Sequence, residues 1–104
     1  MNDAAETLRK AVVERALTGA GTTTPADRRA AFDNRDVPEA ARGLIDKVTK
    51  NAWKVTDEDV AKAKQAGLSD DQVFELSVAA ALGQSTRQLD AALALLDAAK
   101  EPST

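Results

Sequence analysis

Residues Asn51 to Leu82 contain two helix signals separated by a glycine, and this stretch constrains the fold more than any other part of the chain. Thr56 precedes three acidic residues, which is typical of a helix start because the threonine caps free N–H groups and carboxylates complement the helix dipole. Gly67 suits the left-handed position just past a helix end. Ser69 and Gln72 have the spacing of a capping box. We therefore expect an antiparallel helix pair here, at the centre of the fold.

Helix signals recur along the rest of the chain, and no strand-like alternation of polar and apolar residues occurs. Proline stands at the first helical position after Thr24 and after Val37. Gly83 is expected to end one helix, and Ser85 or Thr86 to cap the next. The sequence therefore predicts an all-α fold of about five to six helices. The expected helices cover residues 3–18, 25–34, 38–53, 57–66, 70–82 and 86–100.

Apolar spacing indicates which helix faces are buried. The helix over 70–82 is apolar on most sides, which is typical of a central helix. In the last helix the residues predicted to face inward are Leu89, Ala92, Leu93 and Leu96. Those on other faces, which can add to a subunit interface, are Ala91, Leu95 and Ala98. The segment 19–23 is rich in glycine and threonine and predicts a flexible linker. We divide the chain into N-terminal helices (1–36), a core (37–100) and a disordered tail (101–104).

Composition narrows the classes of partner. The chain has 104 residues and a net charge of −3, which argues against nucleic acid and anionic membranes because both require a basic face. Aromatic residues make up only 3% of it, so a single subunit buries a modest core and oligomerisation is expected to add stability. No apolar run is long enough to span a membrane and the N-terminus is not a secretory signal, so we expect a cytoplasmic protein.

A set of short motifs in one order resembles a known family. They are the acidic helix start at 56–59, the Gln65-Ala66-Gly67-Leu68-Ser69-Asp70-Asp71 segment, the Ala-rich helix from Phe74 to Ala81, and Arg87-Gln88-Leu89. In this order they resemble the carboxymuconolactone decarboxylase/alkylhydroperoxidase D-like family. The resemblance covers roughly residues 37–99. It implies an alkylhydroperoxidase D-like helical module that assembles as a homo-oligomer, a trimer or a hexamer.

The chain departs from that family at its reactive motif, Cys-x-x-Cys-x-x-x-His, because it contains no cysteine and no histidine. The resemblance aligns the two cysteines with Ala52 and Val55, and the histidine with Asp59. Thiol peroxidase chemistry needs one thiolate to attack the peroxide and a second thiol to resolve the product. Ala52 and Val55 supply neither, so the chain alone can act as neither a thiol peroxidase nor a disulfide reductase.

Two carboxylates are candidate catalytic residues. Glu75 lies within an otherwise apolar helix, where a carboxylate must be solvated, paired or functional; pairing with Arg87 or Arg42 is the structural alternative. Asp59 takes the position of the family's histidine, although first-turn aspartates are often simply solvated. The neighbouring Asp57 and Glu58 are better explained as groups that complement the helix dipole.

Trp53 and Arg87 are candidate ligand-binding residues. Trp53 is the only tryptophan, and the competing interpretation makes it a core or interface anchor. Arg87 could instead pair with Glu75 and, in that pair, bind a carboxylated ligand. We predict no cofactor and no metal, because the consecutive residues 57–59 point in different directions around a helix.

Three hypotheses about function remain. The first is a non-redox, homo-oligomeric alkylhydroperoxidase D-like module with a binding or structural role, which can include a small-molecule ligand. The second is a cofactorless lyase similar to carboxymuconolactone decarboxylase, with Glu75 and Asp59 as acid and base on a small acidic or aromatic-derived substrate; it requires a carboxylate of raised pKa beside an apolar pocket. The third is a small helical adaptor. The sequence favours a role without catalysis, and if there is catalysis, a lyase rather than a peroxidase.

Overall fold

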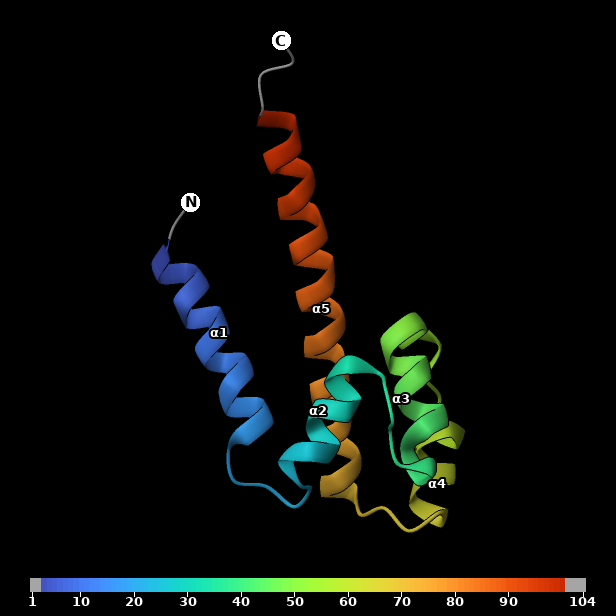
Figure 1. The fold of residues 1–104 in the computed structure, drawn as a ribbon. Helices are drawn as coiled ribbons and strands as arrows, with labels where there is room; N and C mark the ends of the chain where they lie inside the picture. The colour runs from blue at the N-terminus through green and yellow to red at the C-terminus, as the bar shows by residue number, and fades with distance from the viewer. Residues whose placement is uncertain (1–2, 101–104) are drawn as a thin grey trace.

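The computed structural model describes residues 3–100, and its described part is built from α-helices (Figure 1). Five α-helices and one short 3-10 turn follow one another along the chain. Their bounds are α1 Asp3–Thr18, α2 Pro25–Asp33, α3 Glu39–Asn51, η1 Ala52–Lys54, α4 Asp57–Gln65 and α5 Asp70–Lys100. The prediction of an all-α fold is confirmed.

Helix start and end signals predicted from the sequence are present in the structure at α2, α4 and α5. The Thr24 hydroxyl accepts a hydrogen bond from the Asp27 N–H at 3.1 Å, with Pro25 as the first helical residue. At the start of α5, the Ser69 hydroxyl accepts from the Gln72 N–H (3.1 Å) and the Gln72 side chain accepts from the Ser69 N–H (2.8 Å), which completes the predicted capping box. Gly67 has φ of 114°, so the glycine permits the turn that ends α4.

The prediction that Gly83 ends a helix is wrong, because α5 continues through it to Lys100. Gly83 is buried, and a Cβ added there would overlap the backbone carbonyl of Phe32 at the end of α2. The glycine therefore permits close contact between two helices. The expected cap at Ser85 or Thr86 does not form, since both residues lie inside α5.

The main core lies between α5, α2 and α3, with one contribution from α1. Its buried residues include Ile45 from α3 and Leu76 from α5, both almost fully enclosed. No buried residue of α4 belongs to this cluster; Ala63 of α4 packs in a smaller one with Leu44 and Val73. The expected central pair of the helices on either side of Gly67 is therefore corrected: α5 is central, and its main partners are α2 and α3.

The segment between α1 and α2 is an ordered loop rather than the predicted flexible linker. Glu75 of α5 accepts hydrogen bonds from Thr22 and Thr23. Arg28 of α2 is only 4% exposed and donates to the carbonyls of Ala16 (3.1 Å) and Thr23 (3.3 Å). These contacts join the N-terminal helices to the same core as α3 and α5, across the boundary predicted at residues 36 and 37.

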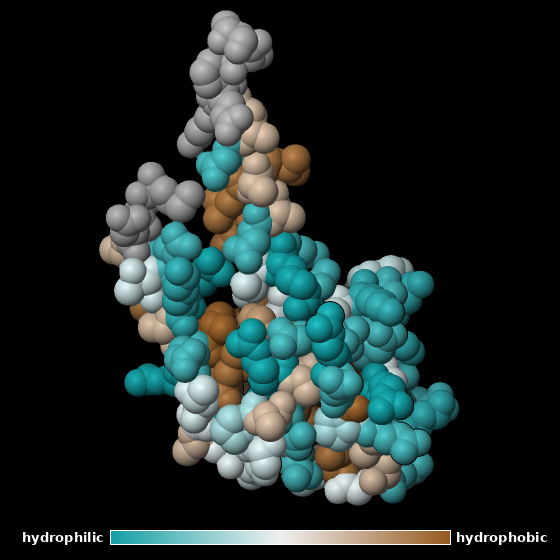
Figure 2. All heavy atoms as spheres, viewed as in Figure 1, coloured by the Kyte–Doolittle hydropathy of each residue, from teal (hydrophilic) through white to brown (hydrophobic). Residues whose placement is uncertain are grey.

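The molecule is elongated because α5 extends beyond its neighbours (Figure 1). The principal-axis extents are 58 × 28 × 21 Å, and the radius of gyration is 16.0 Å, compared with about 13 Å for a compact domain of this length. Hydrophobic residues gather on the protruding end of α5 (Figure 2). None of the helices over residues 3–100 combines the length and apolar content that crossing a membrane requires.

Candidate functional site

An open cavity of about 790 Å³ lies between α3 and α4. Residues four apart on each helix share a face, so this cavity is lined by one face of each helix. Its floor is made of small and apolar side chains, and its edges carry charged ones. The lining residues are Glu39, Ala40, Gly43, Leu44 and Lys47 from α3, and Asp59, Lys62, Ala63 and Ala66 from α4.

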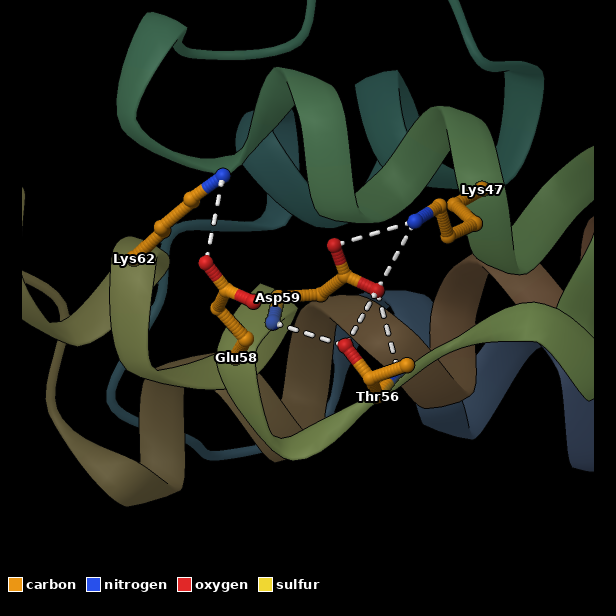
Figure 3. Close-up of polar contacts among 5 residues, drawn as sticks. All are labelled: Lys47, Thr56, Glu58, Asp59 and Lys62. Carbon is orange, nitrogen blue, oxygen red and sulfur yellow. Dashed lines mark hydrogen bonds and ion pairs between the residues drawn. The ribbon is translucent and has the colours of Figure 1, made fainter.

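Asp59 lines this cavity, and its carboxylate is bound by Thr56 and Lys47 (Figure 3). Its Oδ2 accepts from the Thr56 N–H at 2.9 Å while its own N–H donates to the Thr56 hydroxyl at 3.3 Å, a capping box at the start of α4. The Lys47 ammonium, from α3, donates to both carboxylate oxygens at 3.0 and 2.9 Å. The Thr56 N–H first, and then Lys47, hold the pKa of Asp59 below its ordinary value.

Lys62 supplies a second ammonium on the α4 side of the cavity (Figure 3). Its contact with Glu58 is 3.9 Å long and both side chains are mostly exposed, so this ion pair is weak. Lys47, by contrast, is neutralised by Asp59 at hydrogen-bonding distance. Lys62 is therefore the cation that is better able to attract an anionic group into the cavity.

Gly43 leaves this cavity open. A Cβ added to Gly43 would meet no heavy atom within 4 Å, so the glycine is not needed for helix packing. A glycine inside a helix usually either permits close contact with another helix or leaves room beside a ligand. The structure gives Gly43 the second role, which is to leave room beside a site.

Glu75 lies in a different place and binds backbone and hydroxyl donors. Its Oε2 accepts from the N–H (2.8 Å) and hydroxyl (2.7 Å) of Thr22, and its Oε1 from the N–H (2.9 Å) and hydroxyl (2.6 Å) of Thr23. These bonds, led by that of the Thr22 N–H, lower the pKa of Glu75 to about 2. The pairing with Arg87 or Arg42 that the sequence suggested is not formed: both donate to backbone carbonyls, of Phe32 and Val37 respectively.

Arg87 and Trp53 also differ in their surroundings. Arg87 Nη1 donates to the Phe32 carbonyl at 2.7 Å, where its charge complements the C-terminal end of α2. Trp53 is 80% exposed, and the Lys54 ammonium lies 4.9 Å from the centre of its ring. Trp53 is therefore not a core anchor of the single chain, and its predicted roles at a ligand or a subunit interface remain predictions.

The structure thus does not gather the four sequence-predicted site residues. Asp59 alone lines the α3–α4 cavity, while Glu75 and Arg87 support loops and helix ends. Sequence reasoning did not single out Lys47 and Lys62. The signal available for Lys47 was the spacing of Glu39, Gly43 and Lys47, which at four-residue steps share one face of α3. Within residues 3–100, no group of three acidic side chains is placed to hold a metal ion.

Comparison of the chain with protein-family models, curated proteins and solved structures gives no match. The fold and the site geometry are therefore the basis for the functional proposal that follows.

Proposed function

We propose that this chain is a non-redox, alkylhydroperoxidase D-like helical module that works as a homo-oligomer, a trimer or a hexamer, with a binding or structural role. The observation that carries the proposal is the exposed apolar end of α5. A group of exposed apolar side chains on a protein surface marks an interaction site, and at this end of α5 Leu95 is 73% and Leu96 is 54% exposed in the single chain. A second copy is the partner that is always available to cover such a surface.

The free energy available from burying exposed apolar side chains supports self-association. Full burial of a leucine or phenylalanine side chain contributes about 1.5–3 kcal/mol. Phe74, Leu89 and Leu96 share one face of α5 and are each between 38% and 68% exposed, so a symmetric pair that buries them gains about 5–10 kcal/mol from its two copies. Association itself costs about 4–15 kcal/mol. The gain and the cost are similar, which favours a reversible oligomer of moderate affinity.

The α3–α4 cavity is the proposed binding site of this module. Its apolar floor suits the body of a small molecule, and Lys62 at its edge suits a carboxylate or another anionic group. The weak Lys62–Glu58 pair leaves this ammonium available. The absence of cysteine from the chain is consistent with a site that binds but performs no thiol chemistry.

Light scattering coupled to size-exclusion chromatography tests the oligomeric part of the proposal. We expect the wild type to have a mass above the 11.0 kDa of one chain. The Trp53→Ala variant removes the most exposed large hydrophobic side chain. Its mass, compared with that of the wild type, shows whether η1 belongs to the interface. A mass of one chain at every concentration is incompatible with the proposal.

One observation keeps a cofactorless lyase as the second candidate: Asp59 takes the position of the family's histidine and lines the cavity. Acid catalysis at neutral pH requires a carboxyl of raised pKa, whereas the pKa values of both Asp59 and Glu75 are lowered. Asp59 could therefore serve only as a base. Turnover of carboxylated lactones, lost in Asp59→Asn and retained in the matched Asp57→Asn, would establish this candidate; no turnover by the wild type would exclude it for that substrate class.

A further inference from the structure

We propose that α5 pairs with the α5 helix of a second copy, antiparallel and around a two-fold axis at Ser85. This inference rests on the proposed self-association and specifies its contact surface. It starts from one face of α5, called its outer face here, whose residues from Phe74 to Ala99 are exposed except for the half-buried Val78.

From Phe74 to Ala99 this face is a continuous stripe without charged residues, and the exposed Asp71 lies on the same face before it. Its first half contains Phe74, Val78, Ala81 and Ser85. Its second half contains Leu89, Ala92, Leu96 and Ala99. At 100° per residue, these positions lie within a sector of about 80°. All except Val78 are exposed, and Val78 is half-buried.

The core-facing residues lie on the opposite side of the same helix. Leu76, Ala79 and Ala80 are buried, and the buried Gly83 contacts Phe32 of α2. Asp90, which ion-pairs with Arg9 of α1 at 3.8 Å, also lies away from the stripe. The stripe therefore lies on the side of α5 away from these contacts with the core and α1.

The order of large and small side chains makes this stripe complementary to itself. In an antiparallel pair centred on Ser85, Val78 lies opposite Ala92 of the second copy, and Ala81 lies opposite Leu89. Phe74 then lies opposite Leu96, so that the most exposed side chains of the stripe cover each other. A parallel pair would instead place alanine against alanine and leave gaps. Antiparallel packing also opposes the two helix dipoles favourably.

The contact has the size of a modest interface. From Phe74 to Ala99 the stripe is about 38 Å long and about 10 Å wide, given the rise and diameter of an α-helix. Its projected area is about 400 Å² in each copy, below the roughly 800 Å² of a standard interface. Association should therefore be followed up to about 100 μM protein. One two-fold contact gives a dimer, and together with a three-fold contact elsewhere it gives a hexamer.

Cysteine cross-linking tests the orientation cleanly, because the chain contains no cysteine of its own. Ser85→Cys places two thiols at the two-fold axis, where a disulfide can form. Ala92→Cys is the matched control on the same stripe. In the antiparallel pair, residue 92 faces residue 78 of the second copy, so the two thiols lie about 21 Å apart along the axis. We expect covalent dimer from Ser85→Cys and little from Ala92→Cys.

A charged substitution on the stripe gives a second test of the pairing. Leu96→Glu in the Ser85→Cys background would put a carboxylate opposite Phe74 and weaken association by about tenfold or more. Leu8→Glu is the control, because Leu8 on α1 is similarly exposed and lies off the stripe. Circular dichroism verifies that each variant keeps its helices. The pairing is supported if Leu96→Glu abolishes the cross-link and Leu8→Glu preserves it.

The remaining outcomes separate this inference from the proposed function. Equal cross-linking of Ser85→Cys and Ala92→Cys would show a parallel pair and overturn the antiparallel one. An oligomer seen by light scattering without cross-linking at residue 85 would move the interface away from this stripe and leave self-association intact. A single-chain mass at all concentrations would overturn both proposals.

Discussion

At the scale of single residues, the hydrogen bonds that fix this fold are of two kinds, those within one turn of a helix and those between segments far apart in the chain. The capping box of Ser69 and Gln72 is confirmed because both members lie within one turn, so local spacing determines it. Glu75 was recognised as a carboxylate that needs an explanation, but its partners Thr22 and Thr23 are more than 50 residues away in the chain. Such a contact depends on tertiary packing, which no local pattern encodes.

Glu75→Gln should destabilise the fold by about 1–2 kcal/mol at neutral pH. Hydrogen bonds to a charged group each contribute about 1.5–3 kcal/mol, and partial exposure of this site reduces that value. The variant keeps a similar shape but loses the charge, and its amide N–H groups would face the donors of Thr22 and Thr23. Urea unfolding followed by circular dichroism measures the change. Glu58→Gln, at a weak surface pair, should leave stability unchanged.

The same carboxylate should make the stability of the folded chain depend on pH in the acidic range. The pKa of Glu75 is about 2 in the folded chain, compared with an ordinary value of 4.5. Between these pH values the unfolded chain binds a proton that the folded chain does not, so stability falls as the pH falls from about 4.5 to about 2. We expect the difference in unfolding free energy between wild type and Glu75→Gln to narrow across this range. A constant difference from pH 7 to pH 2 would contradict the assigned role of Glu75.

At the scale of elements, the helix starts were predicted and one helix end was not. Gly83 was interpreted as a stop because glycine costs about 1 kcal/mol in a helix interior. Burial of Leu76 and Ala80 before it holds this part of α5 in the core, and the close contact with Phe32 requires a residue without a Cβ. Whether a glycine ends a helix or permits packing depends on the neighbouring helix, which the sequence of one segment does not specify.

Two glycines in helices therefore offer a matched pair of substitutions. Gly83→Ala would drive a methyl group into the Phe32 carbonyl, and we expect a loss of about 3 kcal/mol, typical of an overpacked core. Gly43→Ala meets no heavy atom within 4 Å, so we expect a gain of up to about 1 kcal/mol from helix propensity. Thermal unfolding of the two variants compares them directly. Equal effects would contradict the assignment of Gly83 to packing and of Gly43 to an open cavity.

At the scale of the whole molecule, α5 accounts for the shape. This helix is 31 residues and about 46 Å long, and it accounts for most of the 58 Å extent of the molecule along its longest axis. The sequence predicted the helical class and the apolar end of the chain, but it placed Leu89 and Leu96 inside. Leu89 is exposed because it lies on a different face of α5 from Asp90, which pairs with Arg9 of α1, and Leu96 is exposed because it lies beyond that contact. Sequence periodicity shows which residues share a face; it does not show whether the same chain covers that face.

Small-angle X-ray scattering over a dilution series tests the central claim of self-association most directly, because it gives mass and shape together. We predict a mass above 11.0 kDa at high concentration that falls to 11.0 kDa on dilution, where the radius of gyration approaches the 16.0 Å of one chain. Leu96→Glu should shift this transition to higher concentration. A mass of 11.0 kDa at every concentration, with a radius of gyration near 16.0 Å throughout, would contradict the account.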